Sequence, residues 1–96
     1  MPKFAFAVML THNNDTGDLK AVYFRLRRGA PHETREFANG FAFADYSHEG
    51  YLLGIELLGP CSVTIVDRIA ANESPADRRR MKAFVKDSGP RSIVAA

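Results

Sequence analysis

The sequence predicts a single α+β domain, with a small antiparallel sheet of about five strands followed by one or two C-terminal helices. Over residues 1–60, side chains alternate with the two-residue period of a strand, and segments rich in Gly, Asn and Asp interrupt the alternation. After Pro60 the apolar residues take up helical spacing. A length of 96 residues suits one domain. We therefore expect a sheet over 1–60, a helical extension over 61–88 and a tail over 89–96.

Two long strands are predicted at the start of the chain, over residues 3–10 and 19–28. The first, KFAFAVML, is apolar on both faces, which is typical of a strand that is covered on two sides or lies at an interface. The second, LKAVYFRLRR, has one apolar and one largely polar face. The segment NNDTGD at 13–18 is rich in turn-forming residues, so the two strands are expected to form a hairpin.

Three further strands are predicted before Pro60. Residues 33–37 are short and polar, as expected for a strand at the edge of a sheet. Residues 41–46 and 51–58 alternate again, on either side of a turn. Gly54 lies in the middle of the last strand, where a missing side chain often marks the close approach of another group.

The segment over residues 62–71 has two possible structures. The helical spacing of Val63, Val66 and Ile69 after Ser62 favours a helix. The β-branched side chains in the same segment would also suit a sixth strand. We expect the helix and leave the strand open.

The next helix is predicted from its ends. Ser74 is a typical N-cap residue, Pro75 suits the first helical position, and Gly89 followed by Pro90 ends the helix. The apolar stripe of this helix consists of Met81, Phe84 and Val85. Residues 91–96 are expected to form a frayed tail.

Composition excludes several classes of protein. A hydrophobic share of 46% and a charged share of 25% are ordinary for a globular domain and exclude general disorder. No apolar run is long enough for a transmembrane helix, and the first ten residues do not resemble a signal peptide. The single Cys61 excludes an internal disulfide and fits a reducing compartment. We expect a cytoplasmic protein that does not associate with membranes.

Catalytic, metal-binding and cofactor-binding motifs are missing from the sequence. It has no nucleophile elbow, no phosphate-binding loop and no dinucleotide fingerprint. Cys61 has no His or Asp close to it in the chain, so we expect a buried structural side chain. The three histidines, His12, His32 and His48, lack the spacing of a zinc site. We therefore expect no catalytic residues, no metal and no cofactor.

One polar patch on the predicted sheet is a candidate ligand site. Asp45 and Glu56 lie on strands that we expect to be neighbours, and two carboxylates that approach each other can serve acid–base chemistry or ligand binding. Tyr23 and Arg25 share a face of the second strand and could complete the patch. We expect each carboxylate to pair instead with Arg25 or Arg27 of the neighbouring strand, which is a structural role, and keep the ligand site as the alternative.

The last predicted helix carries a basic stripe. Residues 61–96 hold seven basic and four acidic residues, whereas residues 1–60 hold six basic and seven acidic. The candidate contact residues for a protein partner or for nucleic acid are Arg78, Arg79, Lys82 and Lys86. We expect the stripe to be the solvated face of an amphipathic helix and keep the partner contact as the alternative. A net charge of +2 predicts at most weak binding to nucleic acid.

Four segments within residues 8–60 form a recognisable series, namely AVYFRL at 21–26, ETRE at 33–36, ADY at 44–46 and GYLLGIELL at 50–58. In the order and spacing of these segments, residues 8–60 resemble the bacterial DUF2283 family of domains of unknown function. The chain differs from the family pattern at 47–49, where Ser-His-Glu replaces Asp residues. The resemblance implies a small antiparallel-sheet protein. Some members of the family look like antitoxin partners in bacterial toxin–antitoxin pairs, and no enzymatic activity follows from the resemblance. The four patch residues belong to the matching segments.

The aromatic strands predict more apolar surface than one short sheet and a short helix can cover. Such a surface is typical of interfaces, so we expect a homodimer formed by sheet packing or edge pairing, with a monomer as the alternative. The function we expect is that of a non-enzymatic bacterial binding module, such as an antitoxin-like subunit that contacts a toxin-like protein or DNA. The alternative is a small enzyme or ligand-binding protein that uses the polar patch.

Overall fold

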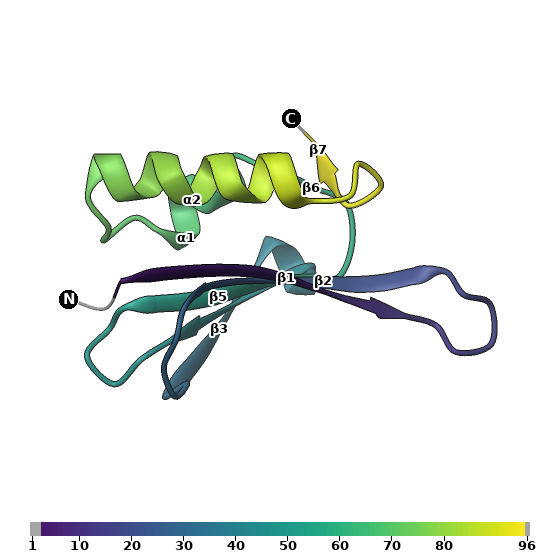
Figure 1. Cartoon of the computed structure of the whole chain (residues 1–96), viewed down its shortest axis with the longest axis horizontal. Coiled ribbons are helices and arrows are strands. Elements are labelled where there is room, and N and C mark those ends of the chain that lie inside the picture. The colour runs from purple at the N-terminus through teal and green to yellow at the C-terminus, as the bar shows by residue number, and fades with distance from the viewer. Residues whose placement is uncertain (1–2, 96) are drawn as a thin grey trace.

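A computed structural model describes residues 3–95 and has the predicted α+β architecture. Five antiparallel strands form one sheet in the order β1-β2-β5-β4-β3, and the helices lie on one of its faces (Figure 1). The strands of this sheet are β1 (Phe4–His12), β2 (Leu19–Arg27), β3 (Glu33–Phe37), β4 (Ala42–Tyr46) and β5 (Leu52–Leu57). A short 3-10 helix, η1 (Ala38–Gly40), joins β3 to β4. The prediction of five strands is confirmed.

The chain after Pro60 forms two short strands and two helices. The elements are β6 (Cys61–Ser62), α1 (Ile65–Ile69), α2 (Pro75–Ser88) and β7 (Val94–Ala95). The prediction of a helix within residues 62–71 is thus confirmed by α1, which follows the two-residue strand β6. Among residues 3–95, no helix is both long enough and apolar enough to cross a bilayer.

The prediction of a frayed C-terminal tail is wrong. Val94 and Ala95 form β7, which pairs in parallel with β6. Ile93 and Val94 are buried in the core. The apolar side chains at the end of the chain cover the end of α2, and this burial outweighs the tendency of a terminus to fray.

The helix α2 begins and ends where its sequence predicts. The Ser74 hydroxyl accepts a hydrogen bond from the Asp77 backbone N–H at 3.1 Å, as an N-cap should. Met81 and Val85 are fully buried against the sheet. Phe84 is partly buried, and its ring stacks on that of Phe6 in β1 at 4.5 Å between centroids. The helix therefore joins the core through the predicted apolar stripe.

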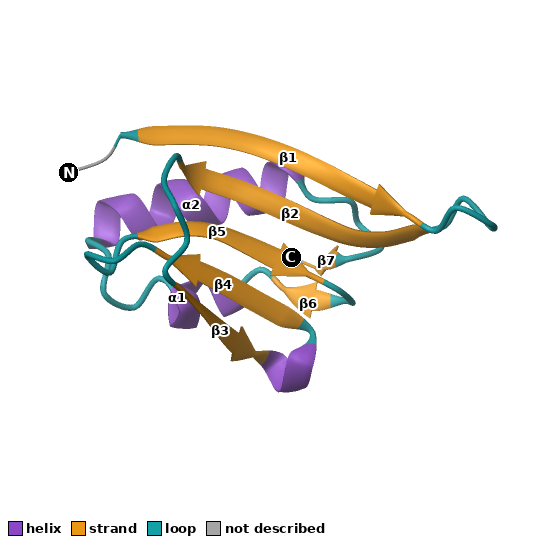
Figure 2. Ribbon diagram, turned by 90° about the horizontal axis from the view of Figure 1, so that it is seen from below, coloured by secondary structure: helices purple, strands orange, loops and turns teal. Residues whose placement is uncertain are grey.

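The core lies between the helices and one face of the sheet. Side chains at alternate positions of β2, β4 and β5 point into it, and the cross-strand register aligns them, with Phe24 opposite Ile55 and Ile55 opposite Ala44. The small Ala42 and Ala44 leave room for α1, whose Val66 and Ile69 are buried. The opposite face of the sheet has no covering layer among residues 3–95 and stays open (Figure 2).

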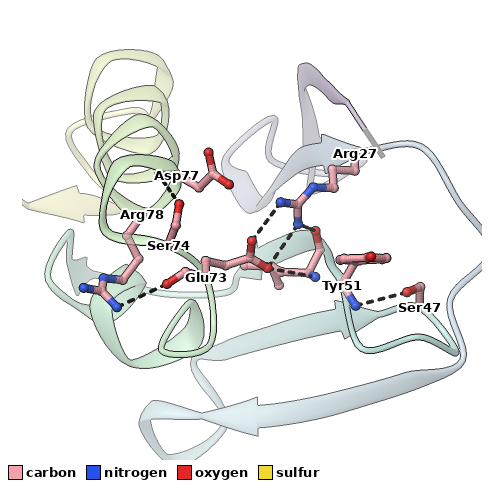
Figure 3. Close-up of polar contacts among 8 residues, drawn as sticks. Arg27, Ser47, Tyr51, Glu73, Ser74, Asp77 and Arg78 are labelled. Atoms are coloured by element: carbon pink, nitrogen blue, oxygen red, sulfur yellow. Dashed lines mark hydrogen bonds and ion pairs between the residues drawn. The ribbon is translucent and has the colours of Figure 1, made fainter. Parts of the chain in front are cut away.

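A buried ion pair joins the sheet to the helical layer. Two nitrogens of the Arg27 guanidinium bind the two carboxylate oxygens of Glu73, with Nη2–Oε1 at 2.7 Å and Nη1–Oε2 at 3.1 Å (Figure 3). The two side chains are only 1% and 9% exposed. Nη1 also donates to the Leu52 carbonyl oxygen at 3.0 Å. The aromatic rings of Phe4 and Tyr51 lie against the guanidinium, so the charge is enclosed on several sides.

Removal of the Glu73 carboxylate is expected to destabilise the fold strongly. The Glu73→Ala variant leaves the Arg27 charge buried and unpaired, which costs about 3–5 kcal/mol of unfolding free energy. The measurement is urea unfolding followed by circular dichroism. The double variant Arg27→Met/Glu73→Leu removes both charges and should recover most of the loss.

The exposed pair Glu33–Arg35 provides the control. Both side chains are about half exposed, at 48% and 49%, so Glu33→Ala should leave the urea midpoint unchanged. Equal midpoints for Glu73→Ala and the wild-type protein would show that the buried pair is not a main support of the fold.

Candidate functional site

The open face of the sheet collects the polar side chains of three neighbouring strands. In the register of β2, β5 and β4, Glu56 lies between Tyr23 and Phe43. Two residues earlier in β5, Gly54 lies between Arg25 of β2 and Asp45 of β4. All these positions point away from the helices because they alternate with the core positions.

A shallow pocket of about 330 Å³ lies on this face. Its lining residues are Tyr23, Thr34, Phe43, Asp45 and Glu56. The Tyr23 hydroxyl donates a hydrogen bond to Oδ2 of Asp45 at 3.1 Å, and the Thr34 hydroxyl donates to Oδ1 at 2.6 Å. Asp45 is therefore fixed by side chains from two other strands, β2 and β3.

Gly54 allows the Tyr23 ring to lie across the middle of the sheet. A Cβ atom at position 54 would overlap with the Tyr23 ring and hydroxyl. The expected close approach at this glycine is thus confirmed, and the approaching group is the aromatic ring of Tyr23. The ring reaches over Gly54 to Asp45, because β5 lies between β2 and β4.

The environment of the pocket keeps the Tyr23 phenol neutral. Burial raises its pKa above the ordinary value of 10.0, and the negative charge of Asp45 raises it further. The hydrogen bond to Asp45 and the charge of Glu56 act in the same direction, whereas the charge of Arg25 opposes them. Tyr23 is consequently a hydrogen-bond donor at neutral pH and a poor nucleophile or base.

The half-buried carboxylate of Glu56 is available to a ligand that enters the pocket. Within residues 3–95 its side chain makes no hydrogen bond and no ion pair. It shares the pocket with Asp45 and with the aromatic rings of Tyr23 and Phe43. Carboxylates accept N–H donors, and aromatic faces attract cations. The pocket is therefore suited to a positively charged group.

The structure brings together three of the four predicted patch residues. Tyr23, Asp45 and Glu56 line the pocket, whereas Arg25 lies beside it and donates from Nε to the Ala5 carbonyl oxygen at 2.9 Å. The expected cross-strand ion pairs are wrong, since Asp45 binds hydroxyl groups and Arg27 binds Glu73. Arginine reaches far enough along its own side chain to find partners outside its row of the sheet.

The sequence reasoning missed two lining residues, Thr34 and Phe43. Phe43 has the same strand parity as Asp45, which is a signal that it shares the face. Thr34 could be placed only after the register of β3 against β4, which sets it opposite Asp45, was known.

The basic stripe of α2 is partly engaged inside the molecule. Lys82 forms an ion pair with Asp67 of α1 at 2.8 Å. Arg78 donates to the carbonyl oxygens of Ala71 and Glu73, both at 3.4 Å. These contacts attach α2 to the segment that precedes it, so the two residues have a structural role in addition to any role in binding.

Two of the candidate contact residues of α2 remain exposed. Arg79 and Lys86 make no side-chain hydrogen bond or ion pair within the described part of the chain. These two residues are available for contacts, and the exposed Arg80 lies beside Arg79 on the same helix.

Within residues 3–95, Cys61 and the histidines form no further candidate catalytic or metal-binding site. Cys61 is buried, as expected, and burial raises the pKa of its thiol, so the reactive thiolate is disfavoured. The fold brings the rings of His32 and His48 to 4.6 Å from each other, which their spacing in sequence does not reveal. No group of three or more metal-ligating side chains occurs in the part of the chain that the structure describes.

Comparison with known proteins finds no matching family model, no matching curated protein and no matching solved structure. The resemblance to DUF2283 stays a prediction from the residues that carry it.

The raised pKa of Tyr23 should make the protein less stable in alkali. In the unfolded chain the phenol loses its proton near its ordinary pKa of 10.0, whereas the folded protein retains it to higher pH. The contribution of Tyr23 to the free energy of unfolding is therefore fully present below pH 10.0, and it falls as the pH rises above this value. Tyr23→Phe should show a smaller fall in urea unfolding measured across this range.

Tyr46 serves as the internal reference for this experiment. Burial also raises its pKa, and it is present in both proteins, so the difference between them reports on Tyr23 alone. An identical alkaline fall in the two proteins would contradict the neutral, donating Tyr23.

Proposed function

We propose that this protein is a non-enzymatic bacterial binding module that holds a basic protein partner in the acidic pocket of its open sheet face. One observation carries the proposal. Glu56 offers a half-buried carboxylate without an intramolecular partner, beside Asp45 and between the rings of Tyr23 and Phe43. A Lys or Arg side chain supplies the positive charge and the N–H donors that such a pocket accepts.

The chemistry of the pocket supports binding over catalysis. Both oxygens of Asp45 already accept hydrogen bonds, from Tyr23 and from Thr34. A raised pKa makes Tyr23 a weak nucleophile.

The partner that fits the pocket is a protein with an exposed Arg or Lys. A basic toxin-like protein has this character, and it would give the chain the antitoxin-like role that the resemblance implies. We place this role in the cytoplasm, where the free Cys61 is stable, and in a homodimer whose interface is treated below. Nucleic acid fits less well, because the pocket is acidic and Arg78 and Lys82, two of the four candidate contact residues of α2, are engaged inside the molecule.

A peptide that contains one Arg between Gly and Ser residues tests the pocket. We expect it to bind and to shift the amide resonances of Tyr23, Phe43 and Glu56 in nuclear magnetic resonance titrations. The same peptide with neutral citrulline in place of Arg should bind about tenfold more weakly or not at all, because it lacks the charge. Binding should also weaken as the salt concentration rises.

Glu56→Gln is the decisive variant, and Glu49→Gln is its matched control. Glu49 is an exposed carboxylate in the turn between β4 and β5, outside the pocket. Loss of binding in Glu56→Gln alone supports the proposal. Equal binding by both variants, or equal binding of the citrulline peptide, would refute it. If butylguanidine alone binds as tightly as the peptide, the pocket serves a small cation and the protein-partner proposal fails.

A further inference from the structure

The outer edge of β1 is an unpaired strand edge in the part of the chain that the structure describes. β1 pairs with β2 on one side only, because it is the first strand of the sheet. In such a strand every second residue directs its backbone N–H and C=O outward. From Ala7 to Thr11 the register against β2 is regular, so this stretch presents a straight row of such groups.

The side chains of β1 give this edge none of the usual protection against pairing. All nine residues, FAFAVMLTH, are free of Lys, Arg, Asp, Glu and Pro. Met9 and Leu10 are 47% and 49% exposed, and Phe4, Phe6 and Val8 are only partly buried. The other edge of the sheet, β3, is short and carries Glu33, Arg35 and Glu36. The two edges therefore differ in the way expected if one is used for pairing and the other is protected.

The two ends of β1 have opposite charge. Lys3 precedes the strand, and the exposed Arg80 of α2 lies over the Phe4 ring at 4.5 Å. The turn after the strand carries the exposed Asp15 and Asp18. The hairpin that ends in this turn projects beyond the helical layer (Figure 1). An antiparallel pair of β1 strands would bring the basic end of each copy towards the acidic turn of the other.

We propose that β1 pairs antiparallel with β1 of a second copy of this chain, which joins the two sheets into one. This inference rests on the homodimeric state proposed above and names its interface. Centred on the regular stretch, the pair sets Met9 opposite Met9 of the second copy and Leu10 opposite Val8. Apolar residues then face apolar residues, and no like charges meet within the strand. The interface is self-complementary, so it closes with two copies.

Charge exchange at Met9 tests both the interface and its register. We expect wild-type protein to elute with twice the chain mass in size-exclusion chromatography with light scattering. Met9→Lys and Met9→Glu should each be monomeric, because each sets two like charges directly opposite one another. An equimolar mixture of the two variants should recover the dimer, because Lys then faces Glu. Met9 is half exposed in the monomer, so both variants should retain the wild-type circular dichroism spectrum.

Amide hydrogen exchange and a control variant separate this interface from others. Edge pairing should protect consecutive amides from Ala7 to Thr11 in the wild-type protein, and Met9→Lys should lose the protection at alternate positions. Phe41→Lys changes a similarly exposed apolar residue, 52% exposed, outside β1 and should leave the dimer intact.

The remaining outcomes refute specific parts of the proposal. A wild-type monomer at all concentrations would refute both the homodimer and this interface. A dimer that survives Met9→Lys, or that the mixture fails to restore, would refute the interface while leaving a homodimer in place. The Arg-peptide titration is independent of these results, so failure of the pocket and failure of the edge are distinguishable.

Discussion

The buried pair of Arg27 and Glu73 is the polar contact that joins the two layers of the fold. It joins the end of β2 to the residue just before the N-cap of α2, and it also binds the backbone of β5 at Leu52. The covering helix is therefore fixed at its N-terminal end by charge and along its length by the apolar contacts of Met81 and Val85. Either charge without its partner would be buried and unpaired, so a shift of the helices that separated the two side chains would be costly.

The helices cover only one face of the sheet, which leaves the opposite face free to form the pocket. Among residues 3–95 no second layer covers the open face, and this face carries polar side chains among its small and aromatic residues. Cross-strand register then gathers Tyr23, Asp45 and Glu56 into one pocket, with no loop needed to form it. A site built on strands is held more rigidly than a site built on loops. The missing side chain of Gly54 is the local condition for this arrangement, because it lets the Tyr23 ring cross the central strand.

The proposed pocket and the proposed interface use different parts of the same sheet. The pocket lies over β2, β4 and β5 with one residue from β3, whereas the interface is the outer edge of β1. Pairing at that edge would leave the pocket of each copy open and would place two pockets on one continuous surface. A partner with two suitably spaced basic residues would then gain from binding both pockets at once.

The sequence by itself determined the strand and helix pattern, because alternation, turn residues and the cap at Ser74 are local signals. Parity along a strand also fixed the face of each of Tyr23, Asp45 and Glu56 within its own strand, whereas the register of β2, β5 and β4 brought the three onto one face. Only the tertiary structure decided the partners of the long side chains. Arg25 and Arg27 reach past their neighbours to Ala5 and Glu73, and Thr34 joins the pocket through the register of β3. The burial of Ile93 and Val94 is likewise a property of the assembled fold, because the apolar surface that they cover exists only after α2 has packed on the sheet.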